Sequence, residues 1–550
     1  MKKIIALFAA VLIAVTAFTG CKAPETGDLT EFKNRPNEVV VYYAYDAYGK
    51  EWITEIARKY MTDHNEDTYI NLKKSLDGGS DLAKVESGVN CGDLYILGLH
   101  MEDGIAYYED LSDVYNSYPI GEEGQKKIIE KVSQYSYEYY ENSGAQNYIM
   151  PKGGSGAGTN YAYNKTVLDE IFPDGYTLPR TTNEFIEMGD AIKNSNTGYY
   201  LLTGAFGDTD SGDYVNYMHK TWFAQLIGYE AYEQFLMGRY YDSATQKWTF
   251  DESAPTVYSK YKNEIKAYYQ TMEDIYSKSN GYLQPDSGVV NQSEGQVILS
   301  GIPFGDYKMG VFMAQGGFVE QEMDWMLAEQ ESAGVPQELG MMKIPVASAI
   351  IERTPSIDNE AELREVIDYV DNILLGESAT KPAGVTDDDI NIILEARSMS
   401  GSYMAGGMIV PKYANNKQGA KDFIRYLASD EAALIAAKCN NGVNTLPFGT
   451  EITEEQLGFE RSNFINQFLE ISKKTRHIIS SDSQEYLFTY IADFDPIPNV
   501  RTIIKNLCNG LKLDEYSADT VFDDALKTYR SEWTNDVLAY KQQGGSTSND

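Results

Sequence analysis

The 550-residue chain has few of the residues that form disulfide scaffolds or bind metals. It contains four cysteines and four histidines, and neither residue type occurs at a spacing typical of a zinc site. We therefore predict a fold that does not depend on disulfides. We also predict no metal site and no cofactor.

Basic residues are scarce beside acidic ones. Lys and Arg together number 46 and Asp and Glu 82, which gives a formal net charge of −36 at pH 7. A surface of this sign disfavours nucleic acid and is repelled by anionic lipid headgroups. The sequence therefore predicts no nucleic-acid partner.

Short catalytic motifs are also missing. The chain has no H-E-x-x-H pair and no G-x-S-x-G elbow, and its glycine-rich stretch at 152–159 lacks the spacing of a nucleotide-binding loop. The stretch 208–213 resembles a calcium loop only loosely, and a polar loop is the simpler interpretation. The many carboxylates leave an acid pair open, so an exported glycoside hydrolase stays an alternative to a non-enzyme.

The long apolar run of the chain lies at its beginning. Lys2 and Lys3 precede an apolar stretch from Ile4 to Ala17, and Phe18-Thr19-Gly20-Cys21 follows. This order is typical of a secretory signal peptide, and the run of ~14 residues is short for a membrane span, which needs about 20. An uncleaved anchor or an ordinary signal peptide are the alternatives.

The cysteine at the cleavage point makes residues 1–21 resemble a bacterial lipoprotein signal, although Phe18 stands where such signals usually have Leu. The resemblance implies a lipid on Cys21 and a protein held at the extracytoplasmic face of a bacterial cell membrane. We expect residues 22–37 to be a flexible tether and residues 541–550 a disordered tail.

After the tether the chain alternates between strand and helix patterns. Strands are predicted at 39–43, 68–72 and 92–97, with helices at 50–63 and 82–88 between them. This alternation predicts an α/β fold with parallel strands, and ligands bind such sheets at the carboxyl ends of the strands. Tyr45 and Asp46 follow the first strand and are therefore candidate ligand-binding residues.

Several longer motifs occur in order along the chain. They are YNKTVLDE at 163–170, LPRTTNEFIEMGDAIK at 178–193, GVFMAQGGF at 310–318, GMMKIP at 340–345, and the strand and amphipathic helix at 406–431. Together they resemble the family 1 extracellular solute-binding proteins of ABC sugar importers, the maltose-binding-like group, over residues 38–448. The chain has Asn183 where that family often has Trp.

The resemblance implies a two-lobed periplasmic-binding-protein-like fold, each lobe a mostly parallel sheet flanked by helices, with a ligand cleft at the hinge. We assign residues 38–151 and 404–446 to lobe one, and residues 152–403 and 447–540 to lobe two. The implied function is capture of a carbohydrate, expected to be an oligosaccharide, and its delivery to ABC transporter permease subunits. The acidic stretch near 357–391 is predicted to form a pair of solvated helices.

Sugar sites combine aromatic rings for the apolar face of the sugar with polar groups for its hydroxyls. The candidate binding residues are Tyr45, Asp46, Asp93, Tyr217, His219, Trp222, Asp306, Phe318 and Tyr403. The family resemblance supports Phe318 and the neighbourhood of Tyr217, His219 and Trp222. Core packing is the alternative for Trp222 and Phe318, and strand capping is the alternative for Asp93.

The lipidation hypothesis makes a direct prediction. The variant Cys21→Ala is expected to lose its lipid and to move from the membrane fraction to the soluble fraction, because Cys21 carries the anchor. Membrane fractionation measures this. A variant that stays in the membrane pellet would show that Phe18-Thr19-Gly20-Cys21 is not a lipidation site.

Overall fold

The computed structural model describes most of the chain after the predicted signal peptide. The described residues are 29–44, 48–75, 78–98, 101–132, 137, 140, 144–153, 158–206, 213–250, 254–302, 309–401, 406–473, 475–477 and 518–542. The chain divides into two compact units: unit 1 comprises Met1–Lys152 and Gly406–Leu457, and unit 2 comprises Gly153–Ala405 and Gly458–Asp550.

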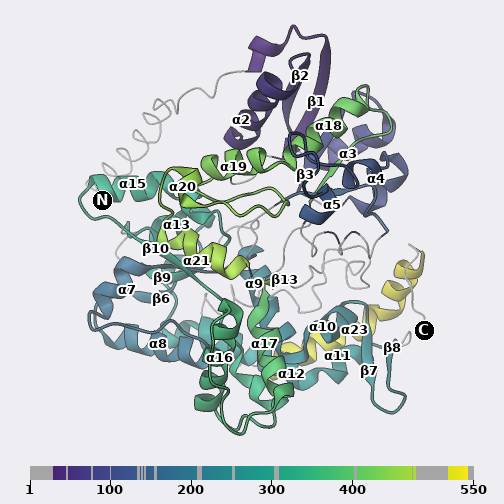
Figure 1. Cartoon of the computed structure of the whole chain (residues 1–550). Helices are drawn as coiled ribbons and strands as arrows, with labels where there is room; N and C mark the ends of the chain where they lie inside the picture. The colour runs from purple at the N-terminus through teal and green to yellow at the C-terminus, as the bar shows by residue number, and fades with distance from the viewer. Residues whose placement is uncertain are drawn as a thin grey trace, which may run out of the picture. The chain divides into compact units, whose positions relative to one another are not determined.

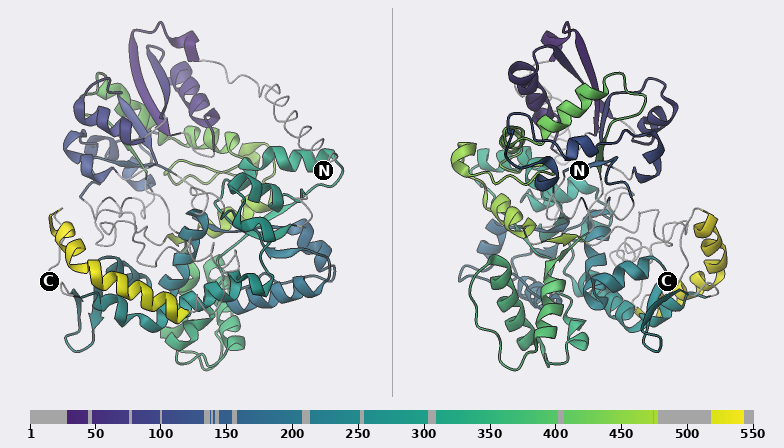
Figure 2. Two further views of the ribbon diagram at one scale, coloured as in Figure 1. Left: turned by 180° about the vertical axis from the view of Figure 1, so that it is seen from behind. Right: turned by 45° about the vertical axis from the view of Figure 1, so that its right-hand side comes forward.

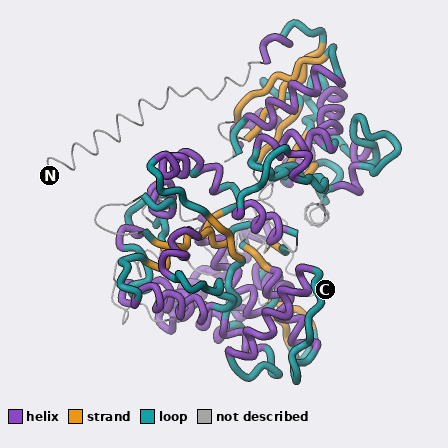
Figure 3. The backbone as a smooth tube through the Cα atoms, turned by 60° about the vertical axis from the view of Figure 1, so that its left-hand side comes forward, coloured by secondary structure: helices purple, strands orange, loops and turns teal. Residues whose placement is uncertain are grey.

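Unit 1 contains a five-stranded sheet in the order β2-β1-β3-β12-β4. Its strands are β1 (Asn37–Ala44), β2 (Thr68–Ser75), β3 (Leu94–Leu97), β4 (Met150–Pro151) and β12 (Gly407–Ile409). Strand β1 pairs in parallel with β2 and β3, whereas β12 is antiparallel to both β3 and β4. All strands except β12 therefore run in one direction, as the sequence predicts for a mostly parallel sheet. Figure 3 shows the strands of the sheet in orange.

Helices from both ends of the unit 1 sequence pack around this sheet. They are η1 (Leu29–Phe32), α2 (Glu51–Lys59), η2 (Tyr60–His64), α3 (Gly78–Ser87), η3 (Glu102–Tyr107), α4 (Ser112–Tyr115), α5 (Ile128–Lys131), α18 (Lys417–Leu427), α19 (Asp430–Cys439) and α20 (Glu454–Leu457). Figure 1 shows α18 and α19 in green among the purple N-terminal elements.

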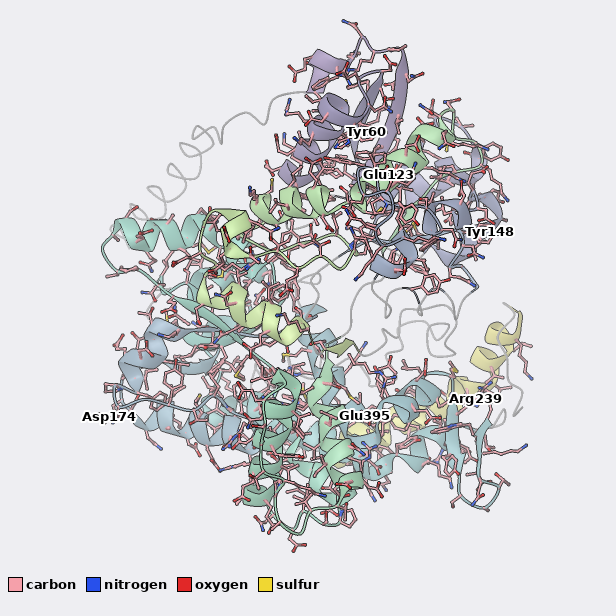
Figure 4. The ribbon with its side chains drawn as sticks, viewed as in Figure 1. Tyr60, Glu123, Tyr148, Asp174, Arg239 and Glu395 are labelled. Atoms are coloured by element: carbon pink, nitrogen blue, oxygen red, sulfur yellow. The ribbon has the colours of Figure 1, made fainter. Side chains whose placement is uncertain are left out.

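The amphipathic pattern of α18 explains this packing. Asn416 caps the helix by accepting a hydrogen bond from the amide of Gly419, and Phe423 is fully buried. The ring of Tyr60, labelled in Figure 4, lies 5.4 Å from the ring of Phe423 and 5.2 Å from that of Tyr426. The N-terminal and C-terminal parts of unit 1 thus share one core.

A buried ion pair fixes the same junction. The Nζ of Lys131 lies 2.8 Å from Glu122 and 2.7 Å from Asp430, and the Lys131 side chain is 4% exposed. The amide of Gly449 donates to the carbonyl of Lys131, and Phe448 bridges to Val132.

Two sequence predictions are corrected in unit 1. Residues 447–457 belong to unit 1 rather than to lobe two, because Ile452 and Leu457 pack on α19. The end of the predicted tether is also folded. Leu29 is buried, and Arg35 donates to the carbonyl oxygens of Met61, Asn65 and Thr68. Residues 22–28 lie outside the described residues.

Unit 2 contains a four-stranded sheet in the order β10-β5-β9-β6. Its strands are β5 (Asn160–Asn164), β6 (Tyr200–Leu202), β9 (Gly310–Gln315) and β10 (Leu339–Met342). Strand β5 is antiparallel to both β9 and β10, while β6 and β9 are parallel. The carboxyl ends of β6, β9 and β10 therefore lie at the same edge of the sheet. Two two-stranded pairs complete the set: β7 (Arg239–Asp242) with β8 (Lys247–Phe250), and β11 (Met399–Ser400) with β13 (Arg476–His477).

Unit 2 also contains many helices. They are α7 (Lys165–Ile171), α8 (Thr182–Asn194), α9 (Asp213–Ile227), α10 (Tyr229–Leu236), α11 (Thr256–Lys260), α12 (Lys262–Tyr276), η4 (Lys278–Asn280), η5 (Pro285–Gly288), α13 (Gln292–Leu299), α14 (Val319–Glu322), α15 (Asp324–Ser332), η6 (Ser348–Arg353), α16 (Glu360–Leu375), α17 (Asp387–Ser398), α21 (Asn463–Ser472) and α23 (Ala518–Gln542). Thr181 caps α8, as the sequence predicts.

Aromatic residues fill the core of unit 2. The ring of Tyr258 stacks on Phe522 at 4.9 Å and meets Tyr529 edge-on at 4.6 Å, which joins α11 to α23. Figure 2 shows α23 in yellow against the teal helices of the same unit. Buried tyrosines account for part of the high tyrosine content.

The acidic stretch near 357–391 forms helices, but it is not simply solvated. Helix α16 carries exposed acids on one face and buries Leu363, Val366, Ile367 and Val370 on the other. Within the described residues no helix is both long enough and apolar enough to cross a membrane.

The ion pair of Lys131 gives a stability prediction. Replacing Lys131 by Ala leaves Glu122 as a buried, uncompensated charge, which should lower the free energy of unfolding by about 3–5 kcal/mol. Urea-induced unfolding measures the change. Lys438→Ala, an exposed lysine on α19, is the matched control and should have little effect. Equal losses in both variants would contradict the role of the pair.

Candidate functional site

The carboxyl ends of β6, β9 and β10 form one edge of the unit 2 sheet. Strand β6 ends at Leu202, β9 at Gln315 and β10 at Met342, and the three strands run the same way. In α/β sheets ligands bind outside the carboxyl ends of strands. This edge is therefore the first place to look for a binding site in unit 2.

A tight turn at the end of β9 presents an aromatic ring. A Cβ added to Gly317 would lie 2.0 Å from the ring of Phe468, and one added to Gly316 would lie 2.7 Å from the ring of Phe318. Neither position has room for a side chain, so the two glycines are required for this close packing. The turn leaves Phe318 half-buried at the first residue before α14.

A second ring lies beside Phe318. Tyr214, near the start of α9, is also half-buried, and its ring centroid is 5.8 Å from that of Phe318 at an interplanar angle of 55°. Half-exposed aromatic pairs of this kind can offer both apolar surface and, through the tyrosine hydroxyl, a polar contact.

Polar side chains with unfilled hydrogen bonds lie at the same edge. Gln315 is the last residue of β9 and Thr203 follows β6, and both are buried. Among the residues that the structure describes, the amide oxygen and nitrogen of Gln315 and the hydroxyl of Thr203 have no hydrogen-bond partner. A buried polar group without a hydrogen-bond partner destabilises the folded protein by about 1–3 kcal/mol. A ligand that supplies the missing partner would therefore bind favourably at such a group.

Two acidic side chains follow Phe318 in α14. Burial raises the pKa of Glu320, which accepts a hydrogen bond from Ser462 at 2.7 Å. Burial also raises the pKa of Glu322, whose carboxylate accepts from Gln296 at 2.6 Å. Both acids follow Phe318 within one turn of helix, and a raised pKa is the property a general acid needs.

Helix α9 holds two further candidates inside the core. Trp222 is fully buried, and its Nε1 donates to the carbonyl oxygen of Pro345 at 2.9 Å. His219 is fully buried as well; its ring stacks on Trp222 at 4.6 Å and meets Tyr276 at 5.0 Å. Burial lowers the pKa of His219 well below its usual value, so the ring is neutral. The structure thus favours the core interpretation of Trp222 and gives His219 a core position too.

Asp93 lies at the amino end of its strand in the unit 1 sheet, opposite the carboxyl end where ligands bind α/β sheets. It directly precedes β3, and its two carboxylate oxygens accept hydrogen bonds from the amides of Val40 and Asn416, each at 2.8 Å. The side chain is 2% exposed. Asp93 therefore serves the framework of the sheet, which is the strand-capping alternative of the sequence analysis.

The remaining sequence candidates cannot be placed in this way. Tyr45, Asp46, Asp306, Tyr403 and the lipidation residue Cys21 lie outside the described residues, and Tyr217 lies on α9 with its side chain outside them. Their assignment stays a prediction. No group of acids, histidines or cysteines suited to hold a metal ion occurs among the described residues.

Unit 1 has a corresponding edge with one residue that the sequence analysis missed. Lys152 directly follows β4, and a Cβ added to Gly98 at the end of β3 would lie 3.5 Å from its Nζ. The amide of Lys152 donates to the carbonyl of Gly406 at 2.6 Å. A cation thus lies at the carboxyl ends of two strands.

The fold can be compared with known proteins. No family model and no characterised protein matches the chain in sequence. Among solved structures, RafE in complex with raffinose matches with a TM-score of 0.53 at 14% identity, covering 90% of this chain and 100% of that chain. The ligand-free form of RafE from Streptococcus pneumoniae matches with a TM-score of 0.53 at 14% identity, covering 91% of this chain and 99% of that chain.

The binding protein msmE from Bacillus subtilis, in an open conformation, matches with a TM-score of 0.50 at 14% identity, covering 90% of this chain and 97% of that chain. The chain has the two-lobed fold of solute-binding proteins. This confirms the α/β fold class predicted from the sequence, and it supports the resemblance to the maltose-binding-like group at the level of the fold.

Sequence reasoning missed Tyr214 and Lys152 and named Gln315 only as part of a motif. Lys152 could have been found, since it directly follows Tyr148-Ile149-Met150-Pro151, which has the residue pattern of a strand. Tyr214 gives no such signal, because its approach to Phe318 depends on how α9 packs against β9.

The framework role of Asp93 can be tested by substitution. Asp93→Ala leaves two backbone amides without their acceptor and should lower the free energy of unfolding by about 2–4 kcal/mol. Asp67→Ala, at an exposed position before β2, is the control and should change stability little. A fully stable Asp93→Ala protein, measured by urea unfolding, would contradict the framework role.

Proposed function

We propose that the chain is an extracytoplasmic carbohydrate receptor, anchored through Cys21 to a bacterial cell membrane, that delivers its ligand to an ABC permease. The observation that carries the proposal is the aromatic pair of Tyr214 and Phe318 at the carboxyl edge of the unit 2 sheet. The shared fold with RafE, one structure of which holds raffinose, supports the class of ligand.

The chemistry of this edge suits a sugar. The C–H face of a pyranose ring packs on aromatic rings, and its hydroxyls need hydrogen-bond partners. Tyr214 and Phe318 supply the rings. Gln315 lies three residues before Phe318, and both the NH₂ donor and the oxygen acceptor of its side-chain amide lack a partner among the described residues. A sugar hydroxyl can accept from the donor and donate to the acceptor.

Gln315 has no exposed surface in this structure, so its contact with a ligand requires the groups above it to move aside. Tyr214 and Phe318 are already half-exposed and would make the first contact. The ligand cleft at the hinge, the permease and the lipid anchor remain parts of the proposal that rest on the family resemblance.

The experiment is a thermal-shift screen of the purified protein against mono- and oligosaccharides, raffinose included, followed by calorimetric titration of the best ligand. A receptor is stabilised in proportion to ligand concentration over Kd. Saturable binding without product formation supports the proposal, and absence of any sugar ligand would overturn it.

An exported glycoside hydrolase is the second candidate. The raised pKa of Glu320 and Glu322 beside the aromatic pair favours it, because a protonated carboxyl group can act as a general acid. Incubation of the protein with its best ligand, followed by product chromatography, separates the two functions. Cleavage that scales with protein concentration and is lost in Glu320→Gln or Glu322→Gln would establish the hydrolase.

The role of Phe318 is predicted as follows. Phe318→Ala should weaken sugar binding by about ten- to a hundredfold, since one stacking ring contributes roughly 1–3 kcal/mol, while stability falls much less than for a core phenylalanine. Titration calorimetry and urea unfolding measure the two quantities.

Trp325→Ala is the matched control for this variant. Trp325 is 56% exposed on α15 of the same unit, so its loss should alter neither affinity nor stability. Unchanged affinity in Phe318→Ala together with a large loss of stability would show that the ring serves the core.

A further inference from the structure

Unit 2 contains a cavity to which the acidic segment 357–391 contributes Asp371, Leu374 and Leu375. It has a volume of about 260 Å³ and lies where the end of β10 meets α16, α17 and α21. Neither the sequence motifs nor the proposed sugar site accounts for it.

One wall of the cavity carries three charged groups. Arg397 of α17 donates two hydrogen bonds to the carboxylate of Asp371 of α16. The Nε to Oδ1 distance is 2.9 Å and the Nη2 to Oδ2 distance is 3.0 Å. The Nη1 of Arg397 also donates to the carbonyl oxygen of Ile344. This forked pair engages both carboxylate oxygens of Asp371.

Lys343, directly after β10, is that third group. Its Nζ forms a long ion pair with Asp371 Oδ1 at 3.6 Å, which is beyond the usual length of a hydrogen bond. The Lys343 side chain is only 17% exposed. The cavity therefore holds a largely desolvated ammonium group with one long ion pair, and an ammonium group has three N–H donors.

The rest of the lining is mostly apolar. Leu178, Leu374 and Ile471 contribute aliphatic surface, and Leu375, which is 51% exposed, reaches the outside. Glu470 of α21 also lines the cavity, and its charge raises the pKa of Lys343, but it is exposed to solvent, which screens its charge. A mostly apolar cavity with a largely desolvated ammonium group has the features of a site for an anion carried on a short hydrocarbon group.

We propose that this cavity binds a small organic carboxylate, with the carboxylate on Lys343 and the hydrocarbon part against Leu178, Leu374 and Ile471. The site is independent of the proposed sugar-binding function. The carboxylate gives Lys343 the hydrogen-bonded counter-ion that Asp371 does not supply, and a charge-assisted hydrogen bond of this kind is among the stronger polar contacts.

The electrostatics of the groups facing Lys343 agree with this. Burial, together with the charge of Arg397, lowers the pKa of Lys343 to about 8. Burial opposes ionisation of Asp371, but Arg397 and Lys343 hold its pKa below the usual value, so it remains a carboxylate. Lys343 is thus mostly protonated at neutral pH and loses its charge as the pH rises past about 8.

The test uses octanoate as the probe, in calorimetric titration of the purified protein at neutral pH. We expect one octanoate site per chain and a loss of affinity of about tenfold or more in Lys343→Gln, because a hydrogen bond to a charged group contributes roughly 1.5–3 kcal/mol. Lys193→Gln, an exposed lysine of α8, is the matched control and should bind octanoate like the unchanged protein.

A second variant guards against misfolding of Lys343→Gln. Leu375→Asp adds a negative charge at an exposed position beside the cavity and should weaken octanoate binding without disturbing the core. Affinity in the unchanged protein should also fall as the pH rises past about 8, and this dependence should vanish in Lys343→Gln.

Three results would overturn the proposal. The first is no saturable octanoate binding. The second is equal binding of octan-1-ol, which would show an apolar cavity in which Lys343 takes no part. The third is tighter binding of inorganic phosphate than of octanoate, which would show a site for compact polar anions instead.

Discussion

Strand β12 completes the sheet of unit 1 although it begins at Gly407, more than 250 residues after β4 ends at Pro151. It pairs with both β3 and β4, so without it the sheet would split into two pieces with unpaired edges. The segment between β4 and β12, which includes the whole sheet of unit 2, is therefore an insertion in the sequence of unit 1. Folding of unit 1 depends on this one long-range pairing.

The returning segment is held by more than backbone pairing. Helices α18 and α19 follow β12 and share a core with α2, and the Lys131 ion pair joins Glu122 to Asp430. The amide of Asp430 also donates to Glu122. A charge as buried as Lys131 is tolerated because both its carboxylate partners are within hydrogen-bonding distance. Lys343 in unit 2 shows a contrasting case, a partly buried ammonium whose ion pair with Asp371 is long because Arg397 already holds that carboxylate.

The direction of the strands decides where chemistry can occur in each unit. Parallel strands bring their carboxyl ends to one edge, and in unit 2 this edge collects Thr203, Gln315 and Phe318 from separate parts of the chain. The same rule separates Asp93 from the binding edge, because it precedes its strand while Lys152 follows one. Position relative to the strand distinguishes a framework residue from a candidate binding residue more reliably than residue type does.

The sequence alone determined the local elements of this protein. The strand and helix patterns of 38–97, the cap at Thr181, the amphipathic face of α18 and the aromatic turn at Phe318 all follow from spacing of a few residues, which local sterics and hydrogen bonding control. The family resemblance extended this to the fold. Neither the local patterns nor the family resemblance predicted which side chains contact one another. Trp222 and His219 carry the residue types of a sugar site yet lie in the core, and Tyr214 meets Phe318 across about 100 residues of sequence. The cavity around Lys343 needs β10, α16, α17 and α21 together. Burial, desolvation and ring contacts between distant segments depend on how the elements pack, and no short-range pattern encodes that packing.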